Sequence, residues 1–401
     1  MSRRKVLYAE AVYDESEIEA VVRVLRTRHL ELINGPAVME FEGLVAELFG
    51  KTHGVMTNSG SSANTLAVAA LDLAPGSEVI TPACTFGTTV APLVQQHLVP
   101  AFVDVELDTF QIDAGKVEEA ITPRTRAMMV PNLIGNLPDW PRLRQIADAH
   151  GLEVIEDSAD TIGSLITGRP SGAFSDVSTT SFYASHVITC AGFGGMACFS
   201  DPDLARRALL LRGWGRRSTL KGESEKAADR FSAVVDSIPY DAKFTYDGVG
   251  YNFLPSEVAA AFGLEQLKKL ESHIEVRIRN FDALCRFFKT FEEWFVLPRQ
   301  AAGTRTAWLA VPLVVRDSAP FTRQDLQGYV EAAGVQTRPI FAGNILRHEG
   351  FAGVACRTVP GGYPVADSVM RGGILLGCHQ GMDEADSTYI CDVFTRFAAE
   401  H

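Results

Sequence analysis

A histidine in a glycine-rich segment has the clearest potential for acid–base chemistry in this sequence. In SFYASHVITCAGFGG, Ser181 and Phe182 end a short predicted strand, and His186 lies in the turn that follows. An imidazole with an ordinary pKa of about 6.5 can accept and return a proton at neutral pH. A histidine in a loop is more often structural, so this segment alone leaves both readings open.

A turn rich in serine and glycine is the candidate anion site. In NSGSSANTLAVAAL, a strand ends before the turn and a helix follows it. Gly60 permits the turn, and Ser61 and Ser62 place hydroxyl groups beside the free N–H groups of a helix N-terminus. Such an arrangement binds phosphate. A plain serine N-cap would require the same residues, so the motif predicts either a phosphate site or a cap.

Two further side chains follow predicted strands. The apolar run LEVIED ends in Glu156 and Asp157, and a carboxylate at the edge of a buried strand is costly unless a cation pairs with it. A protonated pyridine nitrogen would serve, and a helix-capping aspartate is the alternative. Phe86, in PACTFGTTV, could stack on a flat ring or could belong to the core.

The elements that must position these residues predict an α/β fold. Over the first two thirds of the chain, short β-branched runs alternate with segments of helical character. Strands separated by helices imply βαβ units and a mostly parallel central sheet covered on both faces. Ligands bind such sheets outside the carboxyl ends of the strands, which is where the polar residues described above cluster.

The length of 401 residues suggests one large domain and a smaller one. After Pro255 the pattern changes to one or two long amphipathic helices, followed by alternating strands and helices. We therefore expect a large domain over residues 1–255 that carries the site, and a small C-terminal α/β domain over residues 256–401.

Composition excludes several classes of partner. The formal charge of −12 argues against nucleic acid and anionic membranes. No apolar stretch is long enough to span a bilayer, and the start of the chain lacks the apolar core of a signal peptide. The seven cysteines contain no CxxC or CxC pair, which indicates reduced thiols and a cytoplasmic protein.

Together, in their order and spacing along the chain, the four motifs resemble the DegT/DnrJ/EryC1/StrS family of sugar aminotransferases. The resemblance covers nearly the whole chain, through SGSSAN, FVDV, IEDSAD and SFYASH to GYNFLPSEVAAAFGLEQL and TRPIFAGN. It implies the architecture of the fold-type I, aspartate aminotransferase-like enzymes. It also implies that the large domain binds pyridoxal 5′-phosphate.

The resemblance assigns contacts to the cofactor phosphate. Ser61, Ser62 and Ser181 would hold this group, next to Gly60. Asn252 would reach the phosphate of the partner subunit's cofactor. Active sites of this kind are complete only in a dimer, so the resemblance implies a homodimer.

Three further residues would surround the pyridine ring. Phe86 would stack on the ring, and Asp157 would pair with the ring nitrogen. Asp160 stands where most members of the family have a glutamine, near the 3-hydroxyl group of the cofactor.

His186 stands where the family's aminotransferases place the lysine that forms a Schiff base with the cofactor. The same replacement marks a branch of 3-dehydratases, which remove the C3 hydroxyl group of nucleotide-linked 4-keto-6-deoxyhexoses, and the FAGN segment resembles that branch. Imidazole cannot form the imine, so the resemblance implies non-covalently held pyridoxamine 5′-phosphate, with His186 as acid and base. The expected substrate is a nucleotide sugar, and the expected amino donor is glutamate.

Two features depart from that branch. The chain reads ITCAGFGG where the branch usually reads ITMGEGG, and its cysteines do not supply the ligands of an iron–sulfur cluster. We therefore expect no cluster and no metal site. One alternative is a catalytically inactive paralogue that acts as a structural or regulatory partner. Another is an enzyme that uses the same cofactor for elimination or epimerisation on a cyclitol or an aminoglycoside.

Overall fold

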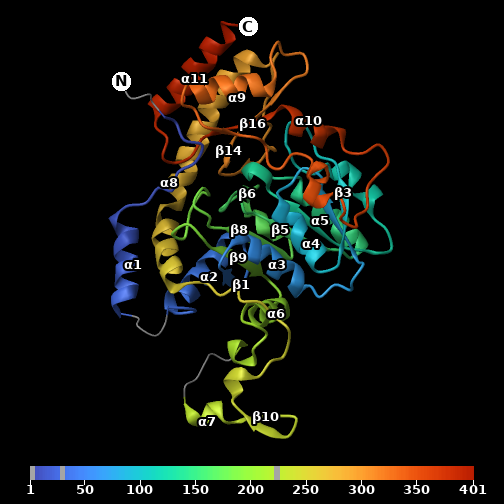
Figure 1. The fold of residues 1–401 in the computed structure, drawn as a ribbon, viewed down its shortest axis with the longest axis vertical. Coiled ribbons are helices and arrows are strands. Elements are labelled where there is room, and N and C mark those ends of the chain that lie inside the picture. Colours follow the sequence, from blue (N-terminus) through green and yellow to red (C-terminus); the bar gives the residue numbers. More distant parts are fainter. Residues whose placement is uncertain (1–4, 28–31, 221–225) are drawn as a thin grey trace.

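The computed structural model describes residues 5–27, 32–220 and 226–401 of the chain (Figure 1). Residues 1–4, on which part of the expectation about a signal peptide rests, lie outside this range. A large body built around one sheet is joined to a smaller sheet by the long helix α8 (Glu257–Phe288). In the part of the chain that the structure describes, no helix is both long enough and apolar enough to cross a membrane.

The large sheet has seven strands. They are, in chain order, β1 (His53–Thr57), β2 (Glu78–Pro82), β3 (Val99–Val103), β4 (Thr125–Pro131), β5 (Glu153–Asp157), β8 (Val177–Ser181) and β9 (Gly195–Phe199). Their order in the sheet is β1-β9-β8-β5-β4-β2-β3. All neighbouring strands pair in parallel except β9, which runs antiparallel to both β1 and β8. The expectation of a mostly parallel central sheet is confirmed.

Helices cover both faces of this sheet, and successive residues of its strands face opposite sides. Met129 packs in one cluster with the apolar residues of α3 (Gly60–Ala70) and α6 (Pro202–Arg212). Its neighbour Met128 packs in another cluster with those of α5 (Trp140–His150). Because both faces are buried, the strands read as continuous apolar runs in the sequence.

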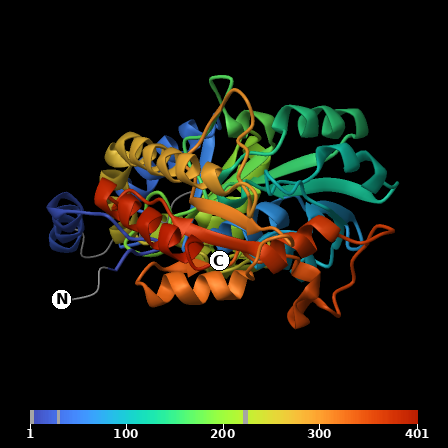
Figure 2. The ribbon, with the colours of Figure 1, turned by 90° about the horizontal axis from the view of Figure 1, so that it is seen from above.

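The small sheet is antiparallel and has the strand order β12-β14-β16-β15. Three helices belong to the same part of the chain. The bounds of these elements are β12 (Phe295–Val296), β14 (Ala310–Val315), β15 (Thr337–Arg338), β16 (Gly373–Gly377), α9 (Arg323–Ala332), α10 (Pro364–Gly372) and α11 (Glu384–Ala398). Seen from above, α8 and α11 run side by side (Figure 2).

Helix α8 belongs to two cores. Its first half packs against α1 (Glu15–Thr27) and α2 (Pro36–Leu48), with Leu270 in the same cluster as residues of the large body. In its second half, Phe288 joins the core of the small sheet. The sequence predicted one or two helices here, and the structure has one. The division at residues 255 and 256 stays a prediction.

Both ends of the described chain meet near the small sheet. Val6 donates a backbone hydrogen bond to Gly334 and accepts one from Gln336, each at 2.9 Å, so the N-terminal segment lies beside β15. The arm that follows α6 projects from the opposite end of the molecule (Figure 1). It carries α7 (Ala227–Arg230) and the hairpin of β10 (Ala233–Val235) and β11 (Ile238–Tyr240).

Candidate functional site

A cavity of about 410 Å³ lies at the carboxyl ends of β5 and β8, where α3 and α4 (Gly87–Gln95) begin. Open α/β sheets bind ligands at this position. Of the residues predicted for the site, Ser62 and Asn252 do not line the cavity. The others do, and they are Gly60, Ser61, Phe86, Asp157, Asp160, Ser181 and His186.

The turn between β1 and α3 forms one end of the cavity. A Cβ atom on Gly60 would lie 2.5 Å from the Cβ atom of Ser181, so the close approach of two segments, rather than the turn itself, requires the glycine. Ser59 is the N-cap of α3. Its Oγ accepts a hydrogen bond from the Ser62 N–H at 3.1 Å and lies 3.0 Å from the Ser62 Oγ. Ser62 is therefore engaged in the cap, and Ser61 faces the cavity beside the unpaired N–H groups of the first helical turn.

Asp157 is a buried carboxylate, 5% exposed, and no ion pair with it occurs among the described residues. Its Oδ2 accepts hydrogen bonds from Asn64 and Thr89, both at 2.8 Å, and its Oδ1 accepts one from the Ala159 N–H at 3.2 Å. Burial raises the pKa of this carboxyl group, and the three hydrogen bonds act in the opposite direction. No helix follows Asp157, which excludes the helix-cap alternative. Neutral donors hold the carboxylate toward the cavity, a geometry that fits a protonated pyridine nitrogen.

Asp160 lies on the same wall, with its Oδ2 accepting a hydrogen bond from the Ile134 N–H at 2.7 Å. Burial and the nearby charge of Asp157 raise the pKa of Asp160 to about 7. At neutral pH this carboxyl group therefore exists in both protonation states, and its protonated form can donate a hydrogen bond to a ligand.

Phe86 lies at the rim of the cavity, not in the core. Its side chain is 51% exposed, and its ring meets that of Phe341 edge to face, with 5.9 Å between the ring centroids. This exposure excludes the alternative that Phe86 belongs to the hydrophobic core. An aromatic ring at this place can stack on a flat ligand.

His186 is half-buried, and its Nδ1 lies 3.1 Å from the carbonyl oxygen of Ser181. A carbonyl oxygen only accepts, so Nδ1 carries the hydrogen and Nε2 keeps the free lone pair. Burial, helped by the charge of Arg277, lowers the pKa of His186 to about 4. The imidazole is thus neutral and basic at neutral pH. No lysine is among the residues that line the cavity.

Asn252 lies outside this cavity on an exposed segment, and its backbone pairs with that of Gly213. Its expected contact with the partner subunit's cofactor stays a prediction.

The sequence analysis missed Tyr8, which lines the cavity although it lies far from the other motifs in the chain. Tyr8 is 8% exposed, and its hydroxyl group has no hydrogen-bond partner. Its N–H donates to Gln336 Oε1 at 3.1 Å, and the Arg338 guanidinium lies 5.5 Å from the centroid of its ring. Burial, followed by the charge of Asp160, raises the pKa of the hydroxyl group. A buried unpaired hydroxyl costs about 1–3 kcal/mol, so a ligand that accepts its hydrogen bond is favoured.

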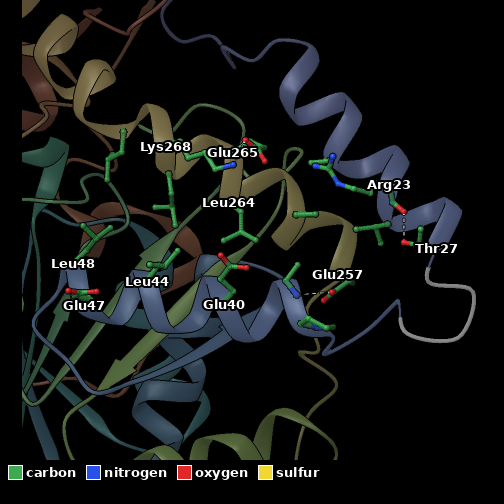
Figure 3. A pocket seen from close by; sticks show the side chains of 17 residues that line it. Arg23, Thr27, Glu40, Leu44, Glu47, Leu48, Glu257, Leu264, Glu265 and Lys268 are labelled. Carbon is green, nitrogen blue, oxygen red and sulfur yellow. Dashed lines mark hydrogen bonds and ion pairs between the residues drawn. The ribbon is translucent and has the colours of Figure 1, made fainter.

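A second hollow, of about 1000 Å³, lies between α1, α2 and the first half of α8 (Figure 3). Its walls are aliphatic and charged side chains, and histidine, cysteine and aromatic residues are absent from them. Glu257 accepts hydrogen bonds from the N–H groups of Ala37 at 2.8 Å and Val38 at 3.1 Å, so this carboxylate caps α2. The chemistry therefore belongs to the smaller cavity. Among the described residues, no group of three or more histidine, cysteine or carboxylate side chains could hold a metal ion.

Residues 12–395 match the family described as the DegT/DnrJ/EryC1/StrS aminotransferase family. A dTDP-4-dehydro-2,6-dideoxy-D-glucose 3-dehydratase from Saccharopolyspora spinosa is 34% identical over 407 residues, which cover 97% of this chain and 86% of that protein. A GDP-4-keto-6-deoxy-D-mannose 3-dehydratase from Yersinia pseudotuberculosis is 31% identical over 379 residues, which cover 93% of each chain.

Solved structures of a related enzyme share the fold. The GDP-4-keto-6-deoxy-D-mannose-3-dehydratase of E. coli with bound hydrated PLP has a TM-score of 0.87 and 28% identity, and the match covers 97% of this chain and 100% of that chain. A GDP-4-keto-6-deoxymannose-3-dehydratase with a trapped PLP-glutamate geminal diamine has a TM-score of 0.86 and 28% identity, covering 96% and 99%. The expected architecture and the expected cofactor, pyridoxal phosphate, are confirmed.

Proposed function

Because the chain belongs to the DegT/DnrJ/EryC1/StrS aminotransferase family, we propose that it is a 3-dehydratase of a nucleotide-linked 4-keto-6-deoxyhexose. The observation that carries the proposal is His186. By the resemblance of the SFYASH segment it stands where the family's aminotransferases have their Schiff-base lysine, and it lines a cavity whose wall contains no lysine. Without that lysine, the protein binds the cofactor non-covalently, as pyridoxamine 5′-phosphate in the working state.

The residues of the cavity fit this cofactor. Ser61 and Ser181, which line the cavity at the start of α3, would hold the phosphate, because the free N–H groups of the helix favour an anion. Phe86 would stack on the ring, Asp157 would pair with the ring nitrogen, and Asp160 would face the 3-hydroxyl group. When bound, the cofactor supplies an amine for the C4 ketone of the sugar and an electron path that expels the oxygen at C3.

His186 moves the proton in this reaction. Its neutral Nε2 would accept a proton from the C4′ carbon of the bound cofactor, and the resulting imidazolium would return it to the C3 hydroxyl group, which would leave as water. Two observations support this assignment. The hydrogen bond from Nδ1 to Ser181 directs the lone pair of Nε2 away from the strand, and burial favours the neutral base.

Glutamate is the proposed amino donor that regenerates the amine form of the cofactor. This choice is supported by the PLP-glutamate adduct in the related structure and by cysteines that are scattered along this chain. We also propose a homodimer, in which Asn252 contacts the partner subunit's cofactor phosphate.

The function is tested by offering the protein GDP-, CDP- and dTDP-linked 4-keto-6-deoxyhexoses together with pyridoxal phosphate and glutamate. We expect glutamate-dependent loss of the C3 oxygen from one of these sugars, measured by mass spectrometry of the sugar nucleotide. Formation of a 4-amino sugar instead would identify an aminotransferase. Turnover of none of them, with the cofactor bound, would favour the inactive paralogue that the altered ITCAGFGG segment suggests, or an enzyme of another substrate class.

Tyr8 is expected to donate a hydrogen bond to the sugar, because its segment approaches from the small sheet, away from the phosphate end of the cavity. The Tyr8→Phe substitution should raise the KM for the nucleotide sugar by about tenfold, the value of one hydrogen bond. It should raise the free energy of unfolding by about 1–3 kcal/mol, since it removes a buried hydroxyl group that has no partner in the protein. Steady-state kinetics and urea unfolding measure both quantities. Tyr13→Phe, at an exposed position outside the cavity, is the matched control, and equal KM values for the two variants would refute the contact.

A further inference from the structure

Behind the His186 turn lies a guanidinium group that is buried without a counterion. Arg277, on α8, is 0% exposed, and no ion pair with it occurs among the described residues. Its N–H groups donate hydrogen bonds to uncharged oxygen atoms. Nη1 donates to the carbonyl groups of Trp308 at 3.2 Å and Leu309 at 3.1 Å, and Nε donates to Gln380 Oε1 at 2.7 Å. A buried charge without an opposite charge is costly, so its retention calls for a reason beyond packing.

Arg277 and Gln380 hold the turn that carries the imidazole. Nη2 of Arg277 donates to the carbonyl oxygen of His186 at 3.4 Å, and Nε2 of Gln380 donates to that of Val187 at 3.2 Å. The same guanidinium binds Leu309, which lines the cavity. One side chain of α8 therefore fixes the His186 turn against the segment that precedes β14.

The charge of Arg277 acts on His186 without opposition from a carboxylate. Burial is the main cause of the lowered pKa of His186, and the charge of Arg277 adds to it, with no other charged side chain of the described residues acting on that pKa. Other titratable side chains around these two residues are Tyr8, Asp160, Tyr183, His273, Cys378 and His379. Beyond His273, Lys269 forms ion pairs with Glu17 at 2.7 Å and with Asp14 at 3.0 Å.

We propose that Arg277 is a positioning residue for His186, which holds the turn through the backbone and keeps the imidazole neutral through an uncompensated buried charge. The use of the neutral imidazole as a base rests on the proposed function, whereas the electrostatic effect does not. A cation on the protein side of the imidazole disfavours a second positive charge there. The free base is thereby preserved at neutral pH.

The charge effect is tested at Gln380, which contacts Arg277 without lining the cavity. Gln380→Glu places a carboxylate against the guanidinium, and Gln380→Met is the uncharged control. Both variants lose the hydrogen bond to Val187, and only the glutamate adds a charge and keeps an acceptor for Arg277 Nε. We expect Gln380→Glu to raise the pKa of His186 by about one pH unit or more, and Gln380→Met to leave it near the wild-type value. The readout is a histidine Cε1 NMR titration of the full chain, with and without pyridoxamine 5′-phosphate. The His186→Asn spectrum assigns the signal.

Equal pKa values of His186 in the two Gln380 variants would overturn the electrostatic part of the proposal, whatever reaction the protein catalyses. The positioning part is tested with Arg277→Lys, which keeps the charge and loses most of the carbonyl contacts. We expect this variant to lower kcat with little change in KM, while the pKa of His186 stays low. Wild-type kcat in a folded Arg277→Lys protein would refute the positioning role. If Arg277→Lys does not fold, Gln380→Met replaces it, because this variant loses one contact with the same turn. A wild-type kcat in Gln380→Met would then refute the positioning role.

Discussion

Replacing His186 with asparagine is expected to slow exchange of the C4′ hydrogen of pyridoxamine 5′-phosphate with solvent by about two to four orders of magnitude, the usual cost of losing a general base. The asparagine amide can still donate to the Ser181 carbonyl oxygen, which the histidine Nδ1 meets at 3.1 Å. The turn should therefore keep its shape and the cofactor should still bind, while the proton acceptor is gone. Deuterium uptake at C4′ in the presence of the 4-keto sugar nucleotide measures the exchange.

His379→Asn is the matched control for this experiment. His379 is also buried, and burial followed by the charge of Arg277 lowers its pKa to about 4, but it does not line the cavity. Its substitution should change the free energy of unfolding and leave the exchange rate close to that of the wild type. Wild-type exchange in His186→Asn would show that another group is the base.

The pH dependence of the exchange provides a second readout of the same residue. Since the pKa of His186 is lowered to about 4, the neutral base is fully present above about pH 5, and the rate should show no acid limb near the ordinary histidine value of about 6.5. A rate that fell with a midpoint near pH 6.5 would contradict the buried environment described here.

The large sheet and most of the cavity could be predicted from local patterns. Runs such as LEVIED are apolar because both sheet faces are covered, and a polar residue at the end of such a run lies at the ligand-binding edge. This reasoning located Asp157, Ser181 and the start of α3, all of which line the cavity. It could not assign Ser61 and Ser62 separately, because the cap at Ser59, which engages Ser62, depends on side-chain rotamers rather than on residue type.

The remaining features depend on contacts between distant parts of the chain. Tyr8 enters the cavity because the N-terminal segment pairs with Gly334 and Gln336, and no local pattern records that pairing. The need for glycine at position 60 arises from the proximity of Ser181, on a strand that is remote in sequence. The charge behind His186 comes from Arg277 on α8, where the sequence shows one more cation on an amphipathic helix.

Asp157→Asn is expected to act in opposite directions on cofactor binding and on the cofactor-free fold. In the proposed loaded state the carboxylate pairs with the protonated ring nitrogen, and breaking a buried ion pair costs about 3 kcal/mol or more. The Kd for pyridoxamine 5′-phosphate should therefore rise by roughly a hundredfold. The exchange at C4′ should slow as well, because the neutral amide does not keep the ring nitrogen protonated. Absorbance titration with the cofactor measures the affinity.

Without cofactor the buried charge of the Asp157 carboxylate destabilises the fold. Burial raises its pKa above the ordinary aspartate value, so its contribution to folding is fully present below that value and is lost as the pH rises through the raised pKa. Asparagine does not titrate, and it can keep the hydrogen bonds at Oδ1 and to Thr89, the latter by rotation of the hydroxyl group, but it loses the one that Asn64 donates to Oδ2. The cost of the unpaired buried charge at pH 7 exceeds that of one hydrogen bond, so the free energy of unfolding of the cofactor-free variant should equal or exceed that of the wild type.

Glu156→Gln is the control that separates the specific effect of Asp157 on cofactor binding from the general effect of removing a buried carboxylate. Glu156 precedes Asp157 on β5 and points to the other face, where it accepts hydrogen bonds from Asn132 at 2.8 Å and Ser178 at 2.7 Å. Its substitution should leave the cofactor Kd unchanged. Urea unfolding of both variants, with and without cofactor, completes the comparison. If Asp157→Asn bound the cofactor with wild-type affinity, Asp157 would not pair with the ring nitrogen. If the cofactor-free Asp157→Asn protein were less stable than the wild type, the carboxylate would instead stabilise the fold.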